Sequence, residues 1–225
     1  SRNKSHLVHA SRAKLPLAWI RKLLFDVHLS PSRRIKLAGF ATPWVLITDA
    51  SPWGIGILLA DSSGTLLEYV SSPLLAFDEQ ALRCKIGECS AQATAEALAL
   101  MVGIRIFGDR FKAAPCKLQL RSDSVAALAT AGKLAAASPV LNFLGAEMAM
   151  DLELFGVLET ETLHLPGALN VTADWLSRIR APGGPPGQKP AALAYAKERQ
   201  CPVRRPGFFR LPTPGDCGAL WGAGA

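Results

Sequence analysis

Four acidic side chains stand at positions where proteins rarely place a charge. Asp49 ends the apolar run "WVLIT", Glu96 lies inside "TAEALAL", Asp123 follows "LQLRS", and Asp174 lies within "VTADWLS". An ionised carboxylate is costly to bury unless a cation or hydrogen-bond donors compensate it. A single acid of this kind is usually an N-cap or half of a salt bridge, but four at the ends of apolar elements indicate a shared site.

Several carboxylates in one place cannot all stay ionised without a counter-charge. Oxygen ligands without a His/Cys set favour magnesium or manganese over zinc, and the five scattered cysteines form no C-x-x-C pair. Two hard cations about 4 Å apart are a recurrent device for cleaving phosphodiesters. The sequence therefore predicts a site for two Mg²⁺ ions, which Mn²⁺ can replace, and no small-molecule cofactor.

The elements that must bring these acids together can be placed from hydrophobic pattern and turn signals. Strands are predicted at about residues 44–48, 54–60, 65–71, 116–120 and 160–165, and the first three form an antiparallel meander. Helices are predicted at about residues 91–111, from 124, at 139–155 and from Asn170, a good N-cap residue. This order predicts an α/β fold with a five-stranded mixed sheet and helices on both faces. If the fourth strand pairs beside the first, Asp49 and Asp123 become neighbours.

Charge is unevenly distributed along the chain. The net charge is +7, yet residues 41–177 hold fifteen acids and eight bases, whereas residues 1–40 hold nine bases and one acid. We expect three parts: a basic segment at 1–40, a domain at 41–180, and a Pro/Gly-rich basic tail at 181–225 with few fixed contacts. The basic arms are either phosphate contacts or solubilising tails. With no long apolar stretch and no signal core, we expect an intracellular protein that neither spans a membrane nor is secreted.

The stretches "TDASPWGIG", "AEALAL", "LRSDSVAAL" and "HLPGALNVTADWLSR" together resemble the ribonuclease H domain of retroelement reverse transcriptases, over about residues 43–180. The resemblance implies a ribonuclease H-like sheet, a D-E-D-D metal site formed by Asp49, Glu96, Asp123 and Asp174, and endonucleolytic cleavage of the RNA strand of an RNA–DNA hybrid. It also implies that residues 1–40 are the tail of an attached polymerase or connection region. Substrate contacts are expected at Ser51, Gln92, Ser124 and Asn170, with the RNA recognised through its 2′-hydroxyl groups.

Two details depart from cellular members of that family. Ala168 follows Gly167 where those enzymes often carry a loop histidine, and His164 is interpreted as a strand residue. Residues 124–160 contain one base, Lys133, so the domain is expected to bind hybrid weakly without the arms or an attached polymerase. Glu88 is a rival to Glu96, but it is expected to precede the helix.

Other hypotheses compete with the nuclease. The main one is a catalytically inactive ribonuclease H-like module that binds nucleic acid or connects domains, although an inactive copy would be free to lose its four acids. An integrase-like or resolvase-like nuclease is disfavoured by "ADWLSR". A nucleotide-binding loop at "GIGILLADSSG" lacks the strand–glycine–helix context that such a loop needs.

Overall fold

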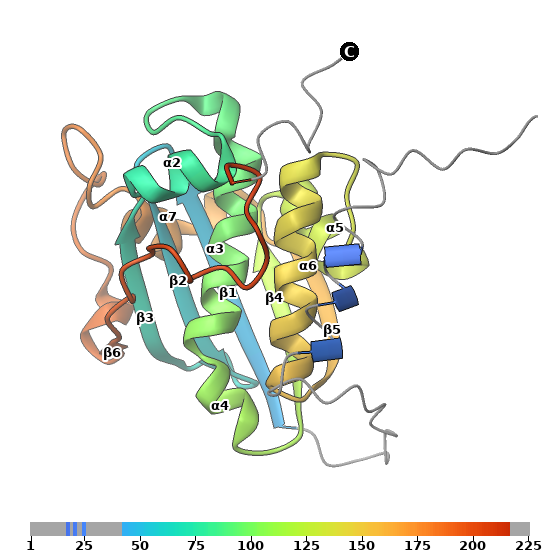
Figure 1. The fold of residues 1–225 in the computed structure, drawn as a ribbon. Coiled ribbons are helices and arrows are strands. Elements are labelled where there is room, and N and C mark those ends of the chain that lie inside the picture. The colour runs from blue at the N-terminus through green and yellow to red at the C-terminus, as the bar shows by residue number, and fades with distance from the viewer. Residues whose placement is uncertain (1–16, 19, 22–23, 26–41, 217–225) are drawn as a thin grey trace, which may run out of the picture.

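The computed structural model describes residues 42–216 and three short pieces near the N-terminus, residues 17–18, 20–21 and 24–25 (Figure 1). Most of the basic segment 1–40 lies outside the described residues. None of the helices in the described part of the chain is long and apolar enough to cross a membrane.

A six-stranded mixed sheet forms the centre of the molecule, with the strand order β5-β4-β1-β2-β3-β6. Its strands are β1 (Thr42–Ser51), β2 (Gly54–Asp61), β3 (Leu66–Pro73), β4 (Cys116–Ser122), β5 (Val157–His164) and β6 (Lys197–Glu198). The first three strands form the predicted antiparallel meander, and β4 and β5 add in parallel beside β1. The predicted α/β, ribonuclease H-like fold is thus confirmed, and the two-residue β6 extends the five predicted strands.

The first strand is longer than its apolar run suggested. Pairing between β1 and β2 continues to Ser51 opposite Gly54, so Asp49 lies inside the strand rather than at its end. The next hairpin is closed by Asp61, whose carboxylate accepts hydrogen bonds from the backbone N–H groups of Ser63 and Thr65. Gly64 follows with a φ of +85°, a conformation that glycine adopts at no steric cost.

Helices cover both faces of the sheet, as predicted (Figure 1). They are α2 (Ala76–Leu82), α3 (Gln92–Ile106), α4 (Gly108–Lys112), α5 (Val125–Lys133), α6 (Pro139–Leu154) and α7 (Val171–Ser177), with 3₁₀ turns η1 (Cys89–Ala91), η2 (Gly167–Leu169) and η3 (Ala191–Ala194). The main core lies between the sheet and α3, α5 and α6, whereas α7 packs on the opposite face in a smaller cluster around Leu58 and Tyr69. The prediction of one helix over 91–111 is wrong at its end, because the buried Phe107 separates α3 from α4.

Residues 197–213, here called the C-terminal strap, pack on the domain, so the prediction of a tail with few fixed contacts is wrong for this segment. The strap begins at the β3 edge of the sheet as β6 and then crosses the face covered by α3 and α6 (Figure 1). Phe209 and Leu211 are buried in the main core, and the Phe209 ring contacts the rings of Phe77 and Phe143. Composition rich in proline and glycine therefore concealed a segment with its own apolar anchors.

Three arginines of the strap form ion pairs with buried carboxylates of the domain. Arg204 is 1% exposed, and its Nε donates to both carboxylate oxygens of Asp78, at 2.8 Å and 3.0 Å. Arg210 pairs with the buried Asp151, and Arg199 pairs with the buried Glu68. Asp151 and Glu68 also pair with Arg105 and Arg110 of the domain, so the strap adds a second counter-charge to each. Asp78 pairs with Arg204 of the strap, and a buried carboxylate that loses such a partner is strongly destabilising.

Candidate metal centre

Three of the four predicted acids meet at one end of the central strands. β1 and β4 pair in parallel up to Arg121, two residues before Asp123, which places Asp123 beside Asp49. Helix α3 crosses the sheet and brings Glu96 to the same place. Carboxylate oxygens of these three residues all lie within 4.8 Å of one another. The structure thus brings together Asp49, Glu96 and Asp123 from three separate parts of the chain.

Burial sets the electrostatics of this cluster. Asp49 is 4% exposed and Glu96 is 3% exposed, whereas Asp123 is only partly buried. Burial, followed by the nearby charges of Asp174 and Asp123, raises the pKa of Asp49 from 3.8 to about 7. Burial, followed by the charges of Asp49 and Asp123, raises the pKa of Glu96 from 4.5 to about 8. Carboxylates that resist ionisation in this way become ionised readily once a cation sits among them.

The donor set fits a hard divalent cation. All the candidate ligand atoms are carboxylate oxygens, which magnesium and manganese prefer and which make a poor zinc site. The raised pKa values of the two buried acids show that the protein alone leaves the negative charge of the cluster poorly compensated. Asp49, Glu96 and Asp123 are therefore the residues that could hold such an ion.

Neighbouring hydrogen bonds fix the orientation of the two buried acids. The Ser177 hydroxyl donates to Asp49 Oδ2 at 2.7 Å, and the Gln92 amide donates to Glu96 Oε1 at 2.8 Å. The Ser122 hydroxyl lies 3.5 Å from Glu96 Oε2, at the limit of a hydrogen bond. Sequence reasoning did not single out Ser177 as a partner of Asp49, although it stands in the quoted "ADWLSR". Only the folded chain shows that this serine faces the site.

Two glycines let α7 approach the strand that carries Asp49. A Cβ at Gly56 would lie 2.1 Å from the Ala173 carbonyl oxygen, and one at Gly54 would lie 2.8 Å from the Ser177 carbonyl oxygen. Gly56 is also the cross-strand partner of Asp49. Close packing of a helix on the β1–β2 hairpin, rather than turn geometry alone, therefore explains these glycines.

Asp174 lies near the cluster but outside it. Its charge raises the pKa of Asp49, yet its carboxylate is not within the 4.8 Å grouping of the other three. Asp174 Oδ1 instead accepts a hydrogen bond from Arg178 Nε at 2.6 Å, one turn further along α7. The role of Asp174 as a fourth ligand remains a prediction.

The four residues predicted to contact substrate all lie around the cluster, and each has a structural hydrogen bond. Ser51 donates to the Ser177 carbonyl oxygen, and Ser124 caps α5 by accepting from the Ala127 backbone N–H. Asn170 is 2% exposed; its amide donates to the Thr48 carbonyl oxygen, so it does not cap α7 through its side chain. Gln92, which is partly buried, bonds to Glu96. Contact with a substrate stays a prediction for all four.

The other two titratable residues considered from the sequence, Glu88 and His164, do not belong to the carboxylate cluster. Glu88 is exposed and pairs with Lys85, outside the carboxylate cluster, in keeping with the preference for Glu96. His164 is the last residue of β5, as interpreted from the sequence, and one ring nitrogen lies 3.1 Å from the Asp123 carbonyl oxygen.

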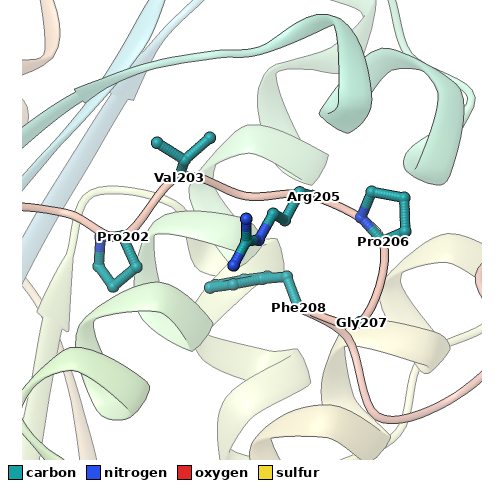
Figure 2. Close-up of a pocket in the computed structure, with 6 residues that line it drawn as sticks. All are labelled: Pro202, Val203, Arg205, Pro206, Gly207 and Phe208. Atoms are coloured by element: carbon teal, nitrogen blue, oxygen red, sulfur yellow. The ribbon is translucent and has the colours of Figure 1, made fainter.

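An open hollow of about 540 Å³ lies elsewhere, within the C-terminal strap. Figure 2 shows it enclosed by the loop from Pro202 to Phe208, with the Arg205 side chain directed toward the Phe208 ring. Its lining contains no carboxylate and a single charged group. The carboxylate cluster, and not this hollow, is therefore the candidate functional site.

No protein-family model and no curated protein matches the chain. Among solved structures, LC11-RNase H1 in complex with an RNA/DNA hybrid is similar at 18% identity and a TM-score of 0.47, over 59% of this chain and 92% of that one. RNase H1 from the archaeon Halobacterium salinarum is similar at 16% identity and a TM-score of 0.44, over 62% and 96% of the two chains. A foamy viral protease-reverse transcriptase with an RNA/DNA hybrid is similar at 13% identity and a TM-score of 0.40, over 66% of this chain and 21% of that one. At these identities the likeness concerns the fold.

Proposed function

We propose that residues 41–180 form a metal-dependent endonuclease that hydrolyses the RNA strand of RNA–DNA hybrids. The observation that carries this proposal is the convergence of Asp49, Glu96 and Asp123, two of them almost fully buried, at one end of a ribonuclease H-like sheet. Burying these acids together destabilises the fold unless a positive charge compensates their negative charge. A hard cation is the counter-charge that an all-oxygen ligand set supports best.

Each residue of the carboxylate cluster has a defined part in this proposal. Asp49, Glu96 and Asp123 would hold Mg²⁺ or Mn²⁺, with Asp174 as a fourth ligand. When bound, such ions supply activation of a water molecule and stabilisation of the leaving oxygen in phosphodiester hydrolysis. Ser177 and Gln92 hold the two buried carboxylates in fixed positions, so little reorganisation is needed at the moment of reaction.

The choice of an RNA–DNA hybrid rests on the resemblance of the four sequence motifs. Ser51, Gln92, Ser124 and Asn170 surround the cluster, and we propose that the more accessible Gln92 and Ser124 contact the RNA strand. Recognition through 2′-hydroxyl groups in the minor groove would give weak sequence preference. The same motifs support a place beside a reverse transcriptase polymerase domain in a retroelement.

We propose phosphate contacts for fewer of the basic residues than the charge of the two terminal segments suggested. Arg199, Arg204 and Arg210 of the strap are paired with the buried carboxylates of Glu68, Asp78 and Asp151, so they are less available to a nucleic acid backbone. The N-terminal segment 1–40 is left as the main candidate for phosphate contacts. Deleting it is expected to weaken hybrid binding more at low salt than at high salt, and an equal loss at both would argue against phosphate contacts.

Cleavage assays on a matched pair of glutamate variants test the function. Labelled RNA–DNA hybrid, duplex RNA and duplex DNA are incubated with the full chain in Mg²⁺ or in EDTA. We expect cleavage of the hybrid's RNA strand in Mg²⁺ only, its loss in Glu96→Gln and its retention in Glu88→Gln. Hybrid binding without any cleavage by the wild type would support the alternative, a catalytically inactive nucleic-acid-binding module, and would refute the enzyme.

A further inference from the structure

Asp174 of α7 and Arg178, the C-cap residue of that helix, form an ion pair whose two charges act on Asp49 of the carboxylate cluster. The 2.6 Å contact from Arg178 Nε to Asp174 Oδ1 joins residues four apart, which are neighbours on a helix surface. Asp174 is close enough for its charge to affect Asp49, yet its oxygens are not among those that converge. The fourth acid is therefore held by a cation belonging to the chain itself.

The charge of Arg178 acts on two of the acids. Its hydrogen bond to Asp174 is the largest cause of the raised pKa of Arg178, and the negative charge of Asp49 adds to it. Reciprocally, the positive charge of Arg178 lowers the pKa of Asp49 against the stronger effect of burial. Arg178 is thus a shared counter-ion at the rim of the site.

The Asp174–Arg178 ion pair contributes little to the stability of the fold, so separating it is energetically inexpensive. The Arg178 side chain is 43% exposed and that of Asp174 is 29% exposed, in contrast to the buried pair of Arg204 and Asp78. Exposed i,i+4 ion pairs contribute little, because water solvates both partners well when they separate. A divalent cation placed among the carboxylates would attract Asp174 more strongly than a single guanidinium does, and would repel that guanidinium.

We propose that Arg178 is the resident counter-ion of Asp174 and is displaced when divalent cations load the site, so that it lowers the affinity of the site for them. The inference rests on the proposed cation site. Arg178 is a positioning residue, since it acts on the cation through Asp174.

Calorimetric titration of the full chain with Mn²⁺, in the absence of nucleic acid, tests this exchange. Arg178→Gln is expected to bind Mn²⁺ about three- to tenfold more tightly than the wild type, and Arg178→Lys to stay within about twofold of it. Arg180→Gln is the matched control, because it removes the same charge from an exposed residue two positions further on. That control is expected to change the dissociation constant less than twofold.

The Arg178→Gln substitution in an Asp174→Asn variant distinguishes displacement of Arg178 by the cation from a role of Arg178 in holding α7 in place. In that background Arg178→Gln is expected to leave Mn²⁺ binding unchanged, because the carboxylate that Arg178 competes for is gone. If Arg178→Gln weakens or does not change binding in the otherwise wild-type chain, the inference is refuted while the cation site stands. If the wild type binds no Mn²⁺, both the inference and the proposed function fail.

Discussion

Replacing Asp49 with asparagine should stabilise the metal-free protein at alkaline pH, although most substitutions of buried polar residues destabilise. The folded-state pKa of Asp49, about 7, lies above its ordinary value of 3.8. Between these values the unfolded chain has released a proton that the folded protein keeps, so stability falls as pH rises through about 7. Asparagine has the shape of the protonated acid, can still accept from Ser177, and carries no charge to bury.

The size of the effect follows from the two pKa values. A rise from 3.8 to about 7 corresponds to about 4 kcal/mol of unfavourable free energy once Asp49 is ionised in the folded state. At pH 5 roughly 1.6 kcal/mol of this is already present, because the unfolded chain is ionised above its own pKa. The advantage of Asp49→Asn over the wild type should therefore grow by about 2–3 kcal/mol between pH 5 and pH 8.

Urea denaturation in EDTA at these two pH values measures the difference directly. Glu96 titrates in both proteins, but its pKa should be lower in the variant because the charge of Asp49 is gone. The comparison at each pH therefore reports Asp49 together with its coupling to Glu96. Asp61→Asn is a suitable control, since Asp61 lies in an exposed turn and its pKa is lowered by hydrogen bonds with Ser63. An advantage of Asp49→Asn that is the same at pH 5 and pH 8 would refute the burial of an uncompensated carboxylate at this position.

Three further predictions concern the strap, α7 and the cation. Arg204→Met should lower the free energy of unfolding by about 3–5 kcal/mol, because it leaves Asp78 buried and unpaired; Arg205→Met, at an exposed neighbour, should change it by less than about 0.5 kcal/mol. Equal effects in denaturant titrations would contradict the structural role of the strap. Gly56→Ala should cost about 1–3 kcal/mol and weaken Mn²⁺ binding by displacing α7, whereas Gly132→Ala, where the nearest atom is 3.3 Å from the added Cβ, should do neither. A wild-type value of Mn²⁺ affinity in Gly56→Ala would show that α7 does not hold Asp49 in place. Mg²⁺ at 100 times its dissociation constant should stabilise the wild type at pH 8 by about 2.7 kcal/mol and leave Asp49→Asn nearly unchanged, as thermal melts with and without EDTA can show.

The sequence was sufficient to predict the antiparallel meander and to single out the three acids that converge. Apolar runs separated by turn residues mark β1, β2 and β3 locally, and a carboxylate after or inside such a run is visible without a structure. The pairing of β1 with β4, on which the meeting of Asp49 and Asp123 depends, was only a condition in the sequence argument, because local pattern does not specify which strands pair; the structure shows that they pair in parallel.

Long-range charge pairing is what the sequence concealed. Arg204 and Asp78 are 126 positions apart, and nothing in "CPVRRPGFF" shows which of its two arginines becomes buried. Asp174 presents a different, local case. Its spacing from Arg178 is that of a helical ion pair, which the structure shows, while its assignment as a fourth ligand stays a prediction.

The most direct test of the proposed cation site is a crystal structure after soaking in Mn²⁺, with diffraction data collected at a wavelength where manganese scatters anomalously. We predict anomalous density between the carboxylates of Asp49, Glu96 and Asp123, with Arg178 turned away from Asp174. Well-ordered carboxylates without any anomalous density between them, at saturating Mn²⁺ and pH 8, would contradict a metal-dependent nuclease at this position.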